Sequence, residues 1–150
     1  RRYNDSFAER NTNFFTLGPR VDYRALEWLT LTLTYLYERG LADGHKDTQF
    51  ADDVSYYLHM VSAGTEFRLN PQWDLGFTYI HRRKTFTSGL AGDTHVGRFD
   101  ATHQGIAELR YHMSAAATVM LSFQYGKRTS TNALRDFQDS ILSIGGQYRF

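Results

Sequence analysis

The sequence predicts an all-β protein, namely a transmembrane antiparallel up-and-down β-barrel with about seven strands in residues 1–150. Three observations support this fold class. Apolar and polar residues alternate in seven segments, the connections between segments alternate between short and long, and aromatic residues gather beside both kinds of connection. Alternation with a period of two is typical of a strand that has one dry and one wet face.

The first two segments show this alternation most clearly. Between residues 15 and 25 the odd positions are apolar, and the even positions include Arg20, Asp22 and Arg24. A tight turn at 26–27 leads into the run LTLTLTY at 29–35, where apolar residues and threonine alternate without a break. A helix would need apolar residues at spacings of three and four, so this run predicts a strand.

Five further segments repeat the pattern. They lie at about 56–69, 73–82, 104–113, 118–128 and 142–150, joined by short turns near 70–72 and 114–116 and by long polar stretches at 40–53, 88–100 and 129–139. Membrane barrels have short turns on one side and long loops on the other. Each segment has about 11–14 residues, which fits a tilted membrane strand and is about twice the usual strand length in soluble domains.

Aromatic residues are frequent, with 11 Phe, 10 Tyr and 2 Trp. One group lies beside the short turns and comprises Tyr23, Trp28, Phe67, Trp73, Tyr111, Tyr148 and Phe150, and a second lies beside the long loops and includes Tyr35, Tyr79 and Tyr125. Two aromatic girdles around an aliphatic band are typical of rings at the two lipid–water interfaces. The alternative is that these rings pack the core of a soluble protein.

Composition excludes several other classes. A net charge of +1 does not indicate a nucleic-acid partner. The absence of cysteine removes disulfide frameworks and thiolate metal sites, and it suits a chain that crosses an oxidising compartment. No window approaches the roughly 18 apolar residues of a membrane helix. The mean hydropathy of −0.50 fits a barrel, because half of each strand would face a polar lumen.

The strand count predicts a larger assembly. Bacterial single-chain barrels close with an even number of strands, because an open edge in lipid leaves backbone groups unsatisfied. We therefore expect residues 1–150 to be the C-terminal portion of a larger barrel, and the alternative is an eight-stranded barrel that lacks most of its first strand. Pro19 cannot donate a ladder hydrogen bond, so a bulge or a register slip is expected at Gly18-Pro19.

Two sequence motifs resemble those of a known family. They are VDYR at 21–24 followed by the run at 29–35, and the ending GGQYRF at 145–150, with an aromatic residue last and another two positions before it. The chain resembles the C-terminal region of Gram-negative outer-membrane β-barrel proteins, and within that group the β-barrel porin families. The resemblance implies a bacterial outer-membrane location, insertion by the barrel-assembly machinery through the terminal strand, and contact with outer-membrane lipids and lipopolysaccharide.

Charges gather on the wet face of the predicted strands. The expected lumen-facing set is Arg20, Asp22, Arg24, Glu66, Arg68, Asp74, Arg82, Glu108, Arg110, Arg128 and Arg149. In a wide barrel these side chains would line water, and the excess of arginine predicts a mild anion preference. In a narrow barrel they would pair into a plug. We expect a pore or an export channel, with polysaccharide among the candidate solutes. The alternative is a structural barrel that holds a periplasmic or surface partner protein.

Enzymatic signals are weak. His112-Met113-Ser114 has the His-x-Ser spacing of outer-membrane lipid A deacylases, but it lies beside a short turn, on the side opposite the outer leaflet. The residues Asp93, His95 and Asp100 could serve a protease of the outer rim, although a polar loop explains them as well. No histidine spacing predicts a metal site, so we expect no enzyme activity, metal or cofactor.

Overall fold

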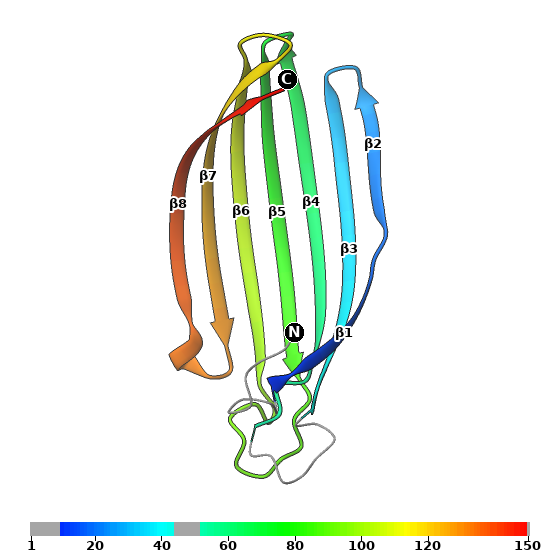
Figure 1. Cartoon of the computed structure of the whole chain (residues 1–150), viewed down its shortest axis with the longest axis vertical. Coiled ribbons are helices and arrows are strands. Elements are labelled where there is room, and N and C mark those ends of the chain that lie inside the picture. Colours follow the sequence, from blue (N-terminus) through cyan, green and yellow to red (C-terminus); the bar gives the residue numbers. More distant parts are fainter. Residues whose placement is uncertain (1–9, 44–51, 150) are drawn as a thin grey trace.

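The computed structural model describes residues 10–43 and 52–149, and it confirms an all-β antiparallel architecture (Figure 1). The strands are β1 (Thr12–Leu17), β2 (Arg20–Leu26), β3 (Leu29–Ala42), β4 (Tyr56–Asn70), β5 (Trp73–Phe86), β6 (Phe99–His112), β7 (Ala117–Ser130) and β8 (Phe137–Tyr148). A short 3-10 turn, η3 (Ala133–Arg135), precedes β8. Within these residues no helix is long and apolar enough to cross a membrane.

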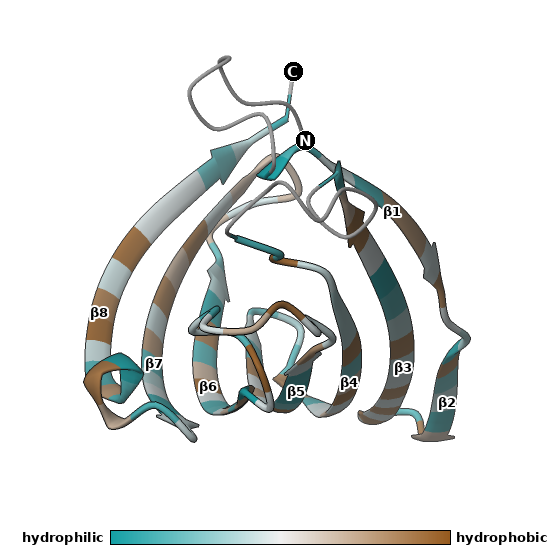
Figure 2. Ribbon diagram, turned by 90° about the horizontal axis from the view of Figure 1, so that it is seen from below, coloured by the Kyte–Doolittle hydropathy of each residue, from teal (hydrophilic) through white to brown (hydrophobic). Residues whose placement is uncertain are grey.

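The strands form one open up-and-down sheet. From β3 to β8 each strand pairs with its neighbour in sequence, and both β1 and β2 pair with β3. The sheet curves into an arc when seen along the strands (Figure 2). No pairing joins β8 to β1 or β2 in the described part of the chain, so the sheet has two free edges. The up-and-down order is thus confirmed, and barrel closure stays a prediction.

The first predicted segment is two strands because Gly18-Pro19 interrupts its ladder. Leu17 pairs with Tyr37 before the break and Arg20 pairs with Thr34 after it, so the register is unchanged and the predicted slip does not occur. The carbonyl of Pro19 still accepts a hydrogen bond from the amide of Tyr35. A Cβ atom on Gly18 would lie 2.0 Å from the Tyr35 carbonyl oxygen, so no side chain fits at that position.

The strands extend further toward the long loops than the sequence indicates. β3, β5, β6 and β7 each have 14 residues and β4 has 15, which confirms the unusual length. β5 continues to Phe86, and β6 already begins at Phe99. The third polar stretch is shorter than expected, since residues 137–139 belong to β8. Connections still alternate between short and long along the sheet.

Register separates the side chains onto two faces. One row of paired positions reads Leu29, Phe67, Leu75, Leu109, Leu121 and Ile144, and the next row reads Thr30, Glu66, Gly76, Glu108, Ser122 and Ser143. We call the apolar side the outer face and the polar side the inner face. The inner face is the concave one. Phe86 lies on that face and its ring contacts His95 of the 87–98 connection, and Figure 2 shows the connection between β5 and β6 inside the arc.

The sheet has almost no apolar core. In the described residues Ala42 and Phe86 are the buried hydrophobic side chains, whereas many large apolar side chains on the outer face are exposed. Tyr23 is 62% exposed and Leu142 is 71% exposed. The aromatic residues therefore do not pack a core within the described sheet, and the outer face is an extended exposed apolar surface.

Candidate functional site

The predicted lumen charges of the strands all lie on the inner face. Cross-strand pairing places Arg24 and Glu66 on either side of Thr30 of β3, and Asp74 lies between Arg68 and Arg110. Asp22, Arg20, Arg82, Glu108 and Arg128 occupy the same side of their strands. Arg149 follows β8, and its amide donates to the carbonyl of Ala116 in the turn before β7.

Ion pairs connect several of these charges. The Arg20 guanidinium donates to both carboxylate oxygens of Asp22 at 2.9 Å, and Thr32 also donates to Asp22. The Arg110 guanidinium pairs with Glu108 on its own strand, and its Nη1 lies 2.9 Å from Oε2 of Glu66 on β4. The inner face therefore carries ion-paired charges, several of which remain partly exposed.

Three further acids, Glu38, Asp100 and Asp139, lie on this face near the long loops. The sequence placed Asp100 and Asp139 in long polar stretches, so it did not assign these two acids to a face of the sheet. Asp100 is 6% exposed and pairs with Arg98 at 2.7 Å, and Tyr56 donates its hydroxyl proton to Glu38. Extending the alternation of the predicted strands into these stretches would have placed Asp100 and Asp139 on the inner face. Their charges offset the arginine excess behind the predicted anion preference.

A buried carboxylate organises the short-turn end of the inner face. Asp74 is 7% exposed, and one of its oxygens lies 2.7 Å from Nε2 of His112. Nδ1 of His112 lies 3.1 Å from the Thr118 hydroxyl, so both imidazole nitrogens are engaged. Ser114 instead accepts hydrogen bonds from the amides of Ala116 and Ala117. His112 and Ser114 are therefore not brought together as a base and a nucleophile.

The predicted interface aromatics lie on the outer face or at its turns. Trp28 stacks on Phe67 with ring centroids 6.1 Å apart, and Trp73 lies 4.6 Å from Tyr111. Tyr23, Tyr35, Tyr79, Tyr125 and Tyr148 share this face through the cross-strand register. Phe150 lies outside the described residues. The aromatics predicted beside the long loops, namely Tyr35, Tyr79 and Tyr125, instead lie near the middle of their strands. For example, β5 continues beyond Tyr79 to Phe86.

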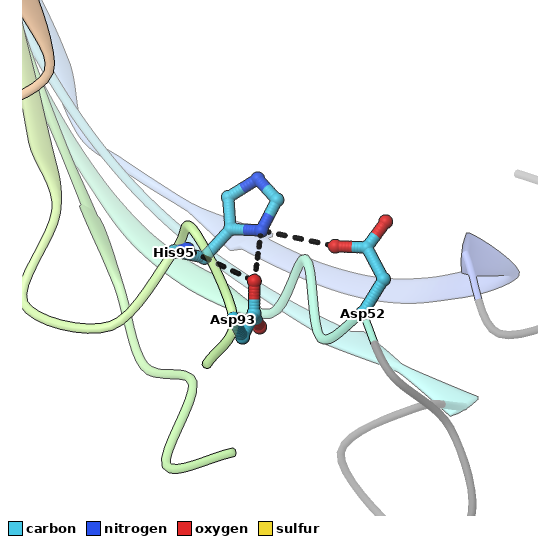
Figure 3. A group of neighbouring side chains, drawn as sticks. All are labelled: Asp52, Asp93 and His95. Carbon is cyan, nitrogen blue, oxygen red and sulfur yellow. Dashed lines mark hydrogen bonds and ion pairs between the residues drawn. The ribbon is translucent and has the colours of Figure 1, made fainter. Parts of the chain in front are cut away.

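Three side chains meet at the long-loop end (Figure 3). Nδ1 of His95 lies 2.8 Å from an oxygen of Asp93 and 3.0 Å from an oxygen of Asp52. Asp52 also pairs with Arg10. Of the predicted outer-rim trio, Asp93 and His95 are therefore adjacent, while Asp100 pairs with Arg98. Asp52 could not be assigned from the sequence, because it is far from Asp93 along the chain.

The Asp93 carboxylate is the anchor of this loop. Burial by itself would raise its pKa, but hydrogen bonds from the Ser88 hydroxyl, the Asp53 and His95 amides and the His95 ring hold the pKa below its ordinary value. The oxygens of Asp52 and Asp93 and a nitrogen of His95 lie within 4.8 Å of one another, which is a spacing a divalent cation could bridge. The same atoms already contact one another directly, and the Asp93 carboxylate also accepts hydrogen bonds from Ser88 and from the Asp53 amide.

Comparisons of the chain with protein-family models, with curated proteins and with solved structures give no match.

Proposed function

We propose that this chain forms part of the wall of an outer-membrane β-barrel that acts as a pore or export channel. The observation that carries the proposal is the contrast between the two faces. The outer face exposes large apolar side chains over its whole width, and the inner face carries paired charges. A sheet with so little buried apolar surface gains stability when lipid covers its outer face and water fills the side with the charges.

The dimensions of the apolar band fit this proposal. On β5 the outer face is apolar from Trp73 to Tyr79, and the two residues are about 20 Å apart along an extended strand. The apolar band of membrane barrels is about 25 Å tall and is bordered by aromatic rings. Trp73 and Tyr111 form the ring pair at one border, and Tyr79 and Tyr125 mark the other.

The free edges of the sheet require further strands. In lipid each unpaired backbone group costs several kcal/mol, so the edges at β2 and β8 must pair with strands of a longer chain or of another copy. Residues 1–150 would then supply part of such a barrel. The barrel-assembly machinery would insert it, and the bacterial outer membrane would be its location.

Conductance in planar bilayers tests the pore. Full-length protein should give stepwise ionic currents with a weak charge preference, because the acids near the long loops offset the arginine excess. A folded, inserted protein that carries no current would contradict the pore.

A sealed scaffold barrel that holds a periplasmic or surface protein is the second candidate. It is favoured by one observation: the 87–98 connection folds against the inner face, where His95 lies 4.7 Å from the Phe86 ring (Figure 2). A loop in this position narrows the lumen. Removing residues 89–92 should raise the current if the loop restricts an open pore, and it should leave a sealed barrel silent.

A further inference from the structure

The outer face carries cationic and imidazole side chains in one zone. They are Arg39, His59, His81, Arg83, His103 and Lys127, which we call the outer cationic band. All six lie in the half of the described strands that is nearer the long loops. The register makes them neighbours, because His59 is opposite Arg83, and His103 is opposite both His81 and Lys127.

No carboxylate of the described strands shares this face. The acids of the strands are Asp22, Glu38, Glu66, Asp74, Asp100, Glu108 and Asp139, and all lie on the inner face. Arg83 and Arg39 instead lie over aromatic rings, 5.0 Å from Phe99 and 5.4 Å from Tyr57 respectively. Arg39, Arg83 and Lys127 thus have no carboxylate partner on their own face of the described strands. The counter-charge of the band must therefore come from outside the sheet.

Tyrosine hydroxyls orient two of the imidazoles. The Tyr35 hydroxyl lies 2.8 Å from Nδ1 of His59, and the Tyr79 hydroxyl lies 2.6 Å from Nδ1 of His103. When the hydroxyl donates to Nδ1, a neutral imidazole carries its proton on Nε2, where it can donate to an anion. The His81 ring on β5 lies tilted against the His103 ring, with the centroids 4.7 Å apart, and the His81 Nδ1 is shielded from solvent without a hydrogen-bond partner in the described chain.

The band lies just beyond the apolar zone of the outer face. Along β5 the outer residues read Phe77, Tyr79, His81 and Arg83, so the change from apolar to cationic occurs within four residues. Tyrosine at this border is typical of the depth of lipid headgroups. Cationic side chains one or two positions further out would then be at the height of headgroup phosphates.

We propose that the outer cationic band binds phosphate groups of lipid headgroups in the leaflet on the long-loop side. This inference rests on the proposed membrane location. Phosphate offers several acceptor oxygens, which match the guanidinium of Arg83, the ammonium of Lys127 and the Nε2 donors of His59 and His103. The headgroup supplies the negative charge that the sheet lacks on this face.

The test uses the full-length protein folded in a neutral detergent. Native mass spectrometry measures the apparent affinity for phosphatidic acid and for phosphatidylcholine, with inorganic phosphate as a competitor. The variant Arg83→Gln/Lys127→Gln removes two band charges. The matched control Arg82→Gln/Arg128→Gln changes the adjacent residues, which lie at the same height on the inner face. Circular dichroism verifies that each variant folds, and single Arg83→Gln is measured beside the double variant.

We expect phosphatidic acid to bind more tightly than phosphatidylcholine, because choline balances the phosphate charge of the latter, and the band variant to lose about fivefold in affinity for each charge removed. The control variant should keep the wild-type affinity, and inorganic phosphate should compete only weakly. Equal affinity for the two lipids, or an equal loss in band and control variants, would overturn the inference. Insertion into pure phosphatidylcholine vesicles is scored separately. A protein that inserts but shows no preference for phosphatidic acid over phosphatidylcholine contradicts this inference alone. A protein that does not insert contradicts the membrane proposal as well.

Discussion

The guanidinium of Arg110 on β6 reaches across β5 to Glu66 on β4, with 2.9 Å between Nη1 and Oε2. Strands two apart in a sheet are separated by about 10 Å, so a direct pair needs both a long side chain and an unobstructed path. Gly76 provides that path, since it lies between Glu66 and Glu108 in the register. The concave curvature of the inner face brings the two side chains together.

Loss of this bridge should destabilise the sheet. In Arg110→Met, Glu66 and Glu108 would face each other over Gly76 without a counter-charge. We expect a loss of about 1–2 kcal/mol in the free energy of unfolding, measured by urea titration of the detergent-folded protein. Adding Glu66→Gln to this variant should recover part of the loss, because the repulsion is removed.

The control for this experiment is Arg82→Gln. Arg82 is an exposed arginine of the same face and has no ion pair within residues 10–43 and 52–149. Its replacement should change the free energy of unfolding by less than about 0.5 kcal/mol. Equal losses in the two arginine variants would show that the bridge does not contribute.

The break in the first segment should tolerate no side chain. Gly18→Ala places a Cβ atom 2.0 Å from the Tyr35 carbonyl oxygen, so β1 or β3 must move. We expect a loss of about 1–3 kcal/mol in the free energy of unfolding, measured by the same urea titration. Gly89→Ala is the matched control, because a Cβ atom there meets nothing within 4 Å. A midpoint unchanged in Gly18→Ala would contradict the close approach of the two strands.

Charge on the inner face should set ion selectivity if the barrel is a pore. Arg82→Glu reverses an exposed inner-face charge, and one unit charge at 4 Å in water changes the energy of a passing ion by about 1 kcal/mol, or about fivefold in permeability. The reversal potential in a salt gradient should shift toward cation selectivity. Thr129→Glu introduces an acid at a similar height on the outer face and should leave the reversal potential unchanged. Equal shifts in both variants would mean that the inner face does not line the conduction path.

Acid should loosen the 87–98 connection through Asp93. Because the pKa of Asp93 is lowered in the folded loop, its contribution to stability is present above the ordinary aspartate pKa and is lost as the pH falls through the lowered value. Hydrogen exchange at the Asp53 and His95 amides, which donate to Asp93, should therefore accelerate in acid after correction for intrinsic rates. In Asp93→Asn this additional acceleration should disappear. Identical pH profiles would assign the acid response to another group.

Local patterns were enough to predict the strands and their faces. The alternation at 29–35 predicted β3, and the same parity placed Glu66, Glu108 and Arg110 on one side of the sheet. This works because successive side chains of a strand point to opposite faces, whatever the rest of the chain does. The run could not show where strands end near the long loops, since polar residues are tolerated there on both faces.

Contacts between distant segments required the folded chain. The bridge from Arg110 to Glu66, the meeting of Asp52 with His95, and the adjacency of His81 and His103 depend on strand register and sheet curvature. Alternation with a period of two predicts neither the register nor the curvature, because every register that keeps the two faces matched has the same alternation. Which residues share a face of the sheet therefore followed from the order of amino acids, and which of them touch one another followed from how the strands align and bend.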